Sequence, residues 1–142
     1  MRDMLAPVFV QIALTFVLMF ALAGSRFGAL RRREVRVSDI ALGQSAWPTR
    51  STQIGNAFQN QFELPLLFYL VVALALFTGT GGWPFVPLAW GFVVARLAHA
   101  AIHTTSNVVS IRFYAYLAGA LILIAMWVLL AVRVLGAAGA PA

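Results

Sequence analysis

Long stretches without charge alternate with short polar segments along this chain. The charge-free stretches lie between Asp3 and Arg26, between Glu63 and Arg96, and between Arg112 and Arg133. About 20 apolar residues suffice to cross the hydrocarbon core of a membrane, and the middle stretch is long enough for two crossings. A cluster of turn-forming residues at 79–84 divides it. The pattern therefore predicts four transmembrane helices, at about residues 4–26, 52–78, 85–105 and 112–134.

Composition agrees with a membrane protein. Of the 142 residues, 62% are hydrophobic and only 10% are charged, and the mean hydropathy is +0.90. A soluble domain of this size could not cover so much apolar surface. We expect an all-α integral membrane protein in contact with the lipid bilayer, with one four-helix domain over residues 1–142 and a first loop at 27–51.

The positive charge is unevenly placed. All ten basic residues are arginine, and the net charge is +6. One loop is strongly basic, because Arg26, Arg31, Arg32, Arg33, Arg36 and Arg50 all fall in or beside it. Arg112 edges the third loop, whereas only Arg2 and Arg133 belong to the opposite side. By the positive-inside rule, loops one and three are cytoplasmic and both termini lie on the other side. We interpret the charge as topology and anionic-lipid contact rather than nucleic-acid binding, and the short loops suit a bacterial inner membrane.

The second predicted helix has a polar face. Gln53, Asn56, Asn60 and Glu63 follow one another at offsets of three, four and three, a spacing that aligns side chains along a helix. Pro65 comes next, and because proline removes a backbone hydrogen bond it can kink the helix and expose carbonyls to a neighbour or ligand.

The third predicted helix presents a matching face with Arg96, His99 and His103. At about 1.5 Å per residue, Glu63 and Arg96 both lie roughly 14 to 17 Å deep. A charge in lipid costs about 3 kcal/mol, so such residues usually pair. We therefore expect an ion pair between Glu63 and Arg96, bracketed by Asn60 and His99, beside a chamber that opens to the cytoplasm.

Other interpretations of this cluster remain open. It could be a polar zipper that fixes helix register or a subunit interface, with about 1 kcal/mol per hydrogen bond. His99 and His103, with Glu63 opposite, could hold a metal ion, but Arg96 opposes a cation and no third strong ligand is evident, so no metal site is predicted. The chain also has no cysteine, so any thiol chemistry must come from a substrate.

Two features outside the cluster are expected to serve packing. Aromatic residues near the span ends favour the membrane interface, namely Trp47, Trp83, Trp90, Tyr114 and Tyr116. In the fourth helix, Gly119 and Ala120 permit close contact with a neighbouring helix.

The run Asn60-Gln61-Phe62-Glu63-Leu64-Pro65-Leu66-Leu67-Phe68, followed by Ala95-Arg96-Leu97-Ala98-His99, resembles the MAPEG family, the membrane-associated proteins in eicosanoid and glutathione metabolism. The resemblance covers nearly the whole chain. It implies a homotrimer of four-helix subunits that binds glutathione between adjacent subunits near the cytoplasmic side. It also implies a hydrophobic electrophile or peroxide as the second substrate.

The resemblance also implies roles for individual residues. Arg112 matches the catalytic arginine that stabilises a thiolate, which is physically sensible because a nearby cation lowers the pKa of a thiol. The predicted glutathione-binding residues are Gln53, Asn56, Asn60, Glu63, Arg96, His99 and His103. At two of these positions the chain differs from the family pattern, with Asn56 where an arginine is common and His103 where a tyrosine is common.

Two function classes follow from these observations. The first is a glutathione-dependent transferase or peroxidase acting on hydrophobic electrophiles. The second is a non-catalytic membrane module, or an accessory subunit of a larger membrane complex, that uses the polar cluster for helix packing.

Overall fold

The computed structural model describes residues 2–41 and 46–138, so part of the predicted first loop and the small-residue tail at 139–142 lie outside it. Helices α1, α4 and α5 each run as one piece, and the second span consists of α2, the short 3-10 helix η2 and α3. The helices are α1 (Arg2–Arg31), η1 (Val37–Asp39), α2 (Thr49–Gln59), η2 (Asn60–Phe62), α3 (Leu64–Phe77), α4 (Phe85–Thr104) and α5 (Val109–Ala138).

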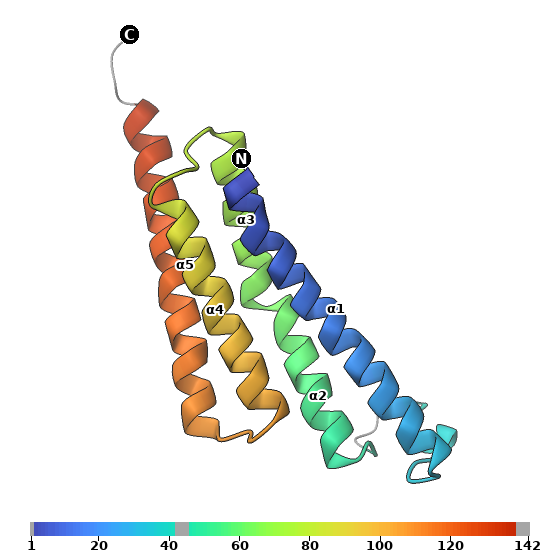
Figure 1. Ribbon diagram of the computed structural model, residues 1–142. Coiled ribbons are helices and arrows are strands. Elements are labelled where there is room, and N and C mark those ends of the chain that lie inside the picture. The colour runs from blue at the N-terminus through green and yellow to red at the C-terminus, as the bar shows by residue number, and fades with distance from the viewer. Residues whose placement is uncertain (1, 42–45, 139–142) are drawn as a thin grey trace.

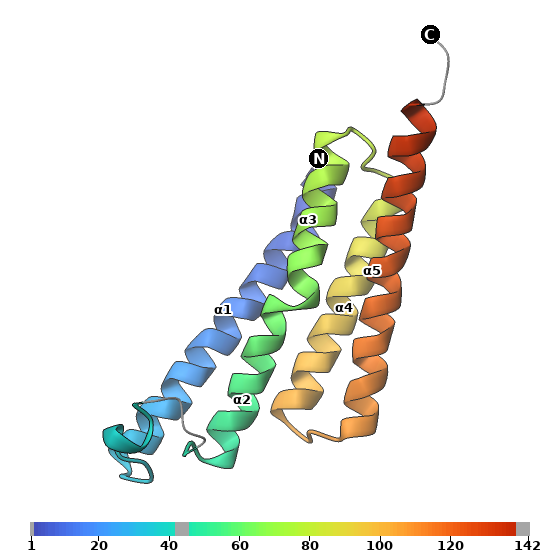
Figure 2. The same ribbon diagram turned by 180° about the vertical axis from the view of Figure 1, so that it is seen from behind.

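Four of these helical units are long and apolar enough to cross a membrane: Arg2–Arg31, Thr49–Phe77, Phe85–Thr104 and Val109–Gly136. The prediction of an all-α integral membrane protein with four spans is confirmed. Figures 1 and 2 show the spans side by side, with α4 packed along α5 and α1 crossing α2 and α3 at an incline. The start of α1, the α3–α4 turn and the end of α5 share one end, here called the terminal end. The α1–α2 and α4–α5 connections share the other, the loop end.

Helices α1 and α5 are longer than predicted. Helix α1 continues to Arg31 instead of stopping near residue 26, so Arg26 and Arg31 lie on helix rather than in a loop. It ends in a Schellman motif, in which the Arg33 amide donates to Leu30 O and the Glu34 amide donates to Ala29 O, both at 3.0 Å. Arg33 adopts the required left-handed conformation with φ of 57°. Arg26 marks the edge of the charge-free segment, but a charged residue at the membrane surface does not terminate a helix.

The second span is broken in mid-course, as the position of Pro65 predicts. Helix α2 ends at Gln59, η2 covers the next turn, and Glu63 has φ −102° and ψ −106° before α3 begins at Leu64. Pro65 has no amide hydrogen to offer to the carbonyl four residues earlier, so a regular α-helix cannot pass through this point. The break places an irregular, partly unpaired backbone inside a membrane span.

Apolar side chains form two clusters, one on each side of this break. Towards the terminal end, α1, α3, α4 and α5 bury a large core in which the Phe68 and Phe92 rings stack at 4.5 Å. Towards the loop end, a smaller cluster joins Leu18, Ala57 and Ala100. Among the described residues, four of the six buried polar side chains fall between these two clusters, namely Gln11, Gln61, Arg96 and His99, whereas Ser51 and His103 lie nearer the loop end. These four residues form a polar layer within the bundle, which positions the candidate site.

Candidate functional site

Arg96 is the centre of the polar layer. Its side chain is 0% exposed, and Nη2 donates to the backbone carbonyl of Asn60 at 2.8 Å. That carbonyl lies at the start of the helix break, so a neighbour does use a carbonyl there, as expected. It is not the carbonyl that Pro65 would face in a regular helix, which belongs to Gln61. Nε and Nη1 of Arg96 have no hydrogen-bond partner among the residues that the structure describes. A buried N–H group without a hydrogen bond is costly, so these two groups are available to donate to a further acceptor.

The predicted ion pair between Glu63 and Arg96 is wrong. Glu63 is exposed on the bundle surface, and over residues 2–41 and 46–138 the one ion pair within 4.0 Å joins Arg32 to Glu34. A 3-10 helix turns about 120° per residue instead of about 100°, so three such residues rotate the following side chain by roughly 60°. The break therefore turns Glu63 away from the direction that a continuous helix would give it.

Asn60 connects the two charged residues indirectly. With its amide nitrogen facing Glu63, Nδ2 lies 3.1 Å and 3.2 Å from the two carboxylate oxygens. In this orientation the side-chain oxygen of Asn60 faces Nδ1 of His103 at 3.4 Å and can accept a hydrogen bond from it, and the backbone carbonyl of Asn60 accepts from Arg96. We choose this amide orientation because a carboxylate accepts a hydrogen bond from N–H and repels a carbonyl oxygen.

The polar stripe predicted on the second span is divided between two faces. Gln53 and Asn60, seven residues apart, are half-buried and face α4. Asn56 and Glu63, also seven apart, are exposed. Gln53 donates to the carbonyls of His103 and Thr105 at 2.7 Å and 3.2 Å, and Arg50 donates to the carbonyl of Thr104. Gln53 and Arg50 thus cap the end of α4, which is a packing role.

An open pocket of about 240 Å³, here called the cavity, lies between η2, α4 and α5 near the loop end. Its lining comprises Asn60, His99, His103, Val109, Arg112, Phe113 and Tyr116. Both histidine side chains are almost fully buried, and their rings meet edge to face with centroids 5.6 Å apart. Nδ1 of His99 is buried without a hydrogen-bond partner in the described part of the chain. The cavity therefore brings together four of the predicted site residues and one unused polar atom.

Arg112 is held at this cavity by a residue that the sequence did not single out. Nη1 of Arg112 donates to Oδ1 of Asn107 at 2.5 Å. Asn107 lies in the α4–α5 turn with φ of 50°, a left-handed conformation that asparagine tolerates better than most residues. The turn consequently fixes the direction of the Arg112 guanidinium at the start of α5.

Tyr116 was expected at the membrane interface, but it lines the cavity. Its ring lies 5.8 Å from the His99 ring, and the Arg96 guanidinium carbon is 5.9 Å from its centroid. The sequence did contain a signal for this position. Tyr116 follows Arg112 by four residues and therefore shares its helix face.

The metal-site interpretation finds no support in the geometry. Within the described ranges no three His, Cys, Asp or Glu side chains lie close enough together to hold a metal ion. His99 and His103 are neighbours, but the exposed Glu63 does not join them.

A second polar contact in the layer was not anticipated. Nε2 of Gln11 on α1 donates to Oε1 of Gln61 at 2.8 Å, and Nε2 of Gln61 donates to the Ala57 carbonyl at 3.1 Å. Both glutamines are buried, at 0% and 2% exposure. Because Gln61 belongs to η2, this pair ties α1 to the helix break and so supports the segment that presents Asn60.

The fold and the cavity define a class: an integral membrane four-helix bundle with a pocket lined by polar and aromatic side chains between η2, α4 and α5 near its loop end. The model of the MAPEG family matches residues 4–132, and the chain belongs to this family. No curated protein and no solved structure gives a significant match.

Proposed function

We propose that this protein is a glutathione-dependent membrane enzyme, a transferase or peroxidase, that acts on hydrophobic electrophiles. The observation that carries the proposal is Arg112, whose guanidinium lines the cavity and is held there by Asn107. Membership of the MAPEG family, which is generally related to glutathione, supports the choice of thiol.

The cavity has donors that suit an anionic thiol tripeptide. Arg112 and the two histidines line it, and Arg96 lies behind Tyr116 with two unpaired N–H groups. Charge-assisted hydrogen bonds from guanidinium to carboxylate or thiolate are among the stronger polar contacts in proteins. Asn60 and Glu63 present acceptors at the same level for the ligand's ammonium group.

A second copy of the chain would complete the site. Thr52, Asn56 and Gln59 are exposed and recur on α2 at offsets of four and three, so they form one polar face, and Glu63 is exposed beyond the helix break. Lipid tails cannot satisfy such a face. The cavity is also smaller than the roughly 300 to 1,000 Å³ of typical ligand pockets. A homotrimer, which the family resemblance implies, would cover the polar face and enlarge the chamber.

In the proposed reaction, the main contribution of the protein is the electrostatic stabilisation of the thiolate. The thiol loses its proton to solvent, and the Arg112 guanidinium stabilises the resulting thiolate. The thiolate sulfur then forms a bond to an electrophilic carbon while the bond from that carbon to its leaving group breaks, and the leaving group departs with the electron pair. With a hydroperoxide, the sulfur bonds to the terminal oxygen while the O–O bond breaks, which gives a sulfenic acid and an alkoxide that takes a proton from water. The apolar surroundings of the bundle would deliver the hydrophobic substrate from the bilayer.

The proposed topology follows from the arginines. Loops one and three face the cytoplasm, and both termini face the opposite side, as in a bacterial inner-membrane protein. This orientation opens the chamber towards the cytoplasm.

Thiolate formation tests the proposal. Detergent-purified protein is titrated with glutathione, and the thiolate is followed by its ultraviolet absorbance at neutral pH. We expect binding in the micromolar to millimolar range with a clear thiolate signal. A cation can lower a thiol pKa from about 8.5 to about 7.5 or below, so Arg112→Gln should reduce the thiolate fraction by about tenfold, whereas Arg112→Lys should retain part of it.

Arg2→Gln is the matched control, because it removes one exposed positive charge at the terminal end and should leave the signal unchanged. If the wild-type protein shows neither binding nor thiolate at high glutathione, the enzyme proposal fails. The non-catalytic membrane module would then be the better explanation.

A further inference from the structure

One face of α1 is a lipid-facing stripe that ends in an arginine. Phe9, Phe16, Phe20 and Phe27 are 65%, 52%, 68% and 70% exposed, and their offsets of seven, four and seven place them on one side of the helix. Arg31 follows Phe27 by four residues on the same side. Phe9 to Arg31 spans about 33 Å at 1.5 Å per residue, close to the roughly 30 Å hydrocarbon core. Arg31 therefore lies at the level of the phospholipid headgroups.

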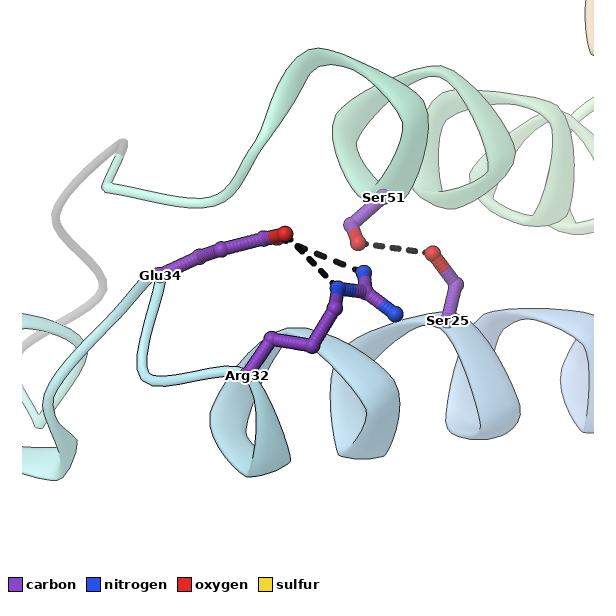
Figure 3. Close-up of polar contacts among 4 residues, drawn as sticks. All are labelled: Ser25, Arg32, Glu34 and Ser51. Atoms are coloured by element: carbon purple, nitrogen blue, oxygen red, sulfur yellow. Dashed lines mark hydrogen bonds and ion pairs between the residues drawn. The ribbon is translucent and has the colours of Figure 1, made fainter.

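The charges around Arg31 are mostly unneutralised. Six arginines but only Glu34 and Asp39 fall within residues 26–50. Glu34 is occupied by Arg32, which donates from Nε at 2.7 Å and from Nη2 at 3.3 Å (Figure 3). Asp39 accepts from the backbone amide of Arg36 and from the Ser38 hydroxyl. Three exposed guanidinium groups have no hydrogen-bond partner within the described ranges: Arg31, Arg33 and Arg36.

The surface that presents these groups is well anchored. The Ser25 and Ser51 hydroxyls form a 2.7 Å hydrogen bond between α1 and α2, also visible in Figure 3. Val35 is buried, which ties the chain after α1 to the bundle. Arg26 stacks on Trp47 at 4.8 Å, and its Nε is buried without a partner in the part of the chain that the structure describes. Phe27 and Val37, each 70% exposed, flank the arginines with apolar side chains.

We propose that this loop-end arginine surface, formed by Arg26, Arg31, Arg33 and Arg36, binds the phosphate of anionic phospholipids. Guanidinium groups bind phosphate oxygens in a bidentate manner. A phospholipid is favoured over a free anion because the surface continues a lipid-facing stripe, and because Phe27 and Val37 can enter the acyl region beside the headgroup. The site is separate from the cavity around Arg112 and does not depend on glutathione binding.

Lipid retention in nanodiscs tests the proposal. The protein is reconstituted with equal amounts of phosphatidylcholine and phosphatidylglycerol, and the lipids bound to it are quantified by native mass spectrometry. Both leaflets have the same composition, so the orientation of a variant does not affect the result. We expect the wild type to retain phosphatidylglycerol preferentially, and less so at high salt. Each arginine contributes roughly fivefold, so Arg31→Gln/Arg33→Gln/Arg36→Gln should lower this preference roughly 100-fold.

Three controls separate a headgroup site from general charge. Arg2→Gln removes one charge at the terminal end and should change the preference less than twofold, against roughly fivefold for Arg31→Gln. The triple lysine variant at positions 31, 33 and 36 keeps the charge but loses the bidentate geometry, so it should retain only part of the preference. The part that it retains also shows that the loss in the glutamine variant does not come from misfolding. Inorganic phosphate should displace the lipid no better than chloride at the same ionic strength.

Four results would overturn the proposal. These are equal retention of the two lipids by the wild type, an unchanged preference in the triple glutamine variant, an equal loss in Arg2→Gln and Arg31→Gln, and specific displacement by inorganic phosphate. The last result would assign the surface to a soluble phosphate.

Discussion

The hydrogen bond between Gln11 and Gln61 offers a quantitative test of how the helix break is held. Gln61 accepts from Nε2 of Gln11 and donates to the Ala57 carbonyl, whereas Oε1 of Gln11 has no partner among the described residues. The two side chains are therefore not equivalent. Substitution by methionine, which is unbranched and of similar length, removes the amide with little change in volume.

The bonding pattern predicts an order of stabilities. Gln11→Met leaves Oε1 of Gln61 unpaired but also removes the existing unpaired oxygen, so we expect a loss of about 1 kcal/mol. Gln61→Met leaves both ends of the fully buried Gln11 amide unpaired, which should cost about 2 kcal/mol. The double variant has no unpaired amide at all and should lose less than about 1 kcal/mol. The coupling free energy of the cycle is then about −2 kcal/mol.

The four proteins are compared by reversible unfolding, in which SDS is added to detergent micelles and helix content is followed by circular dichroism. Protein concentration is kept constant, because oligomerisation would shift the apparent stability. Val17→Met is the matched control, since Val17 is 63% exposed on the same helix as Gln11 and its substitution should change stability by no more than about 0.5 kcal/mol. Additive single effects, or a smaller loss for Gln61→Met than for Gln11→Met, would refute the reasoning.

Two further predictions concern helix packing and the loop. A Cβ at Gly119 would lie 3.7 Å from Ala95 Cβ and from Arg96 Cδ. Gly119→Ala should therefore stabilise the bundle by about 0.5 to 1 kcal/mol, whereas Gly119→Leu should cost about 1 to 3 kcal/mol in the same SDS titration; equal effects would contradict this close contact. The Arg32 hydrogen bond lowers the pKa of Glu34 below its ordinary value, so any stabilisation is present above the unfolded-state pKa and is lost as the pH falls through the folded-state pKa. An NMR titration should show the pKa of Glu34 rising in Arg32→Gln, and an unchanged pKa would exclude the ion pair in solution.

The sequence predicted the features that follow from the length of a segment or from the type of a single residue. The stretches without charge predicted the four spans, because the hydrocarbon core excludes charged residues over a fixed thickness. Pro65 predicted the position of the helix break, because the missing amide hydrogen is a local property of that residue. The close approach of α5 to α4 at Gly119 also followed from residue size. In each case one residue type has one physical consequence that does not require knowledge of its neighbours.

The contacts inside the polar layer depend on how far each side chain is rotated about its helix axis, which residue spacing alone does not give. The expected pairing of Glu63 with Arg96 assumed that the second span is a continuous helix up to Glu63. The 3-10 turn at Asn60–Phe62 changes the rotation per residue. The predicted depth of Glu63 along the span does not depend on this rotation, but the predicted direction of its side chain does. Asn107 and Gln11 were missed for a related reason, since a single polar residue in a turn or an apolar helix has no periodic pattern.

The balance of charge around Arg96 favours an anionic occupant of the chamber. Placing an arginine in the membrane costs about 3 kcal/mol or more, and a hydrogen bond to a charged group contributes about 1.5 to 3 kcal/mol. The single contact with the Asn60 carbonyl therefore offsets much of the cost but leaves two N–H groups unpaired. Glu63 is exposed and contacts the Asn60 amide, and its charge acts on Arg96 from beyond ion-pair distance. Under the proposed function, a carboxylate or thiolate bound near Arg112 and Tyr116 would place a negative charge close to this cation, and the helix break contributes by presenting the Asn60 carbonyl that holds Arg96 in place.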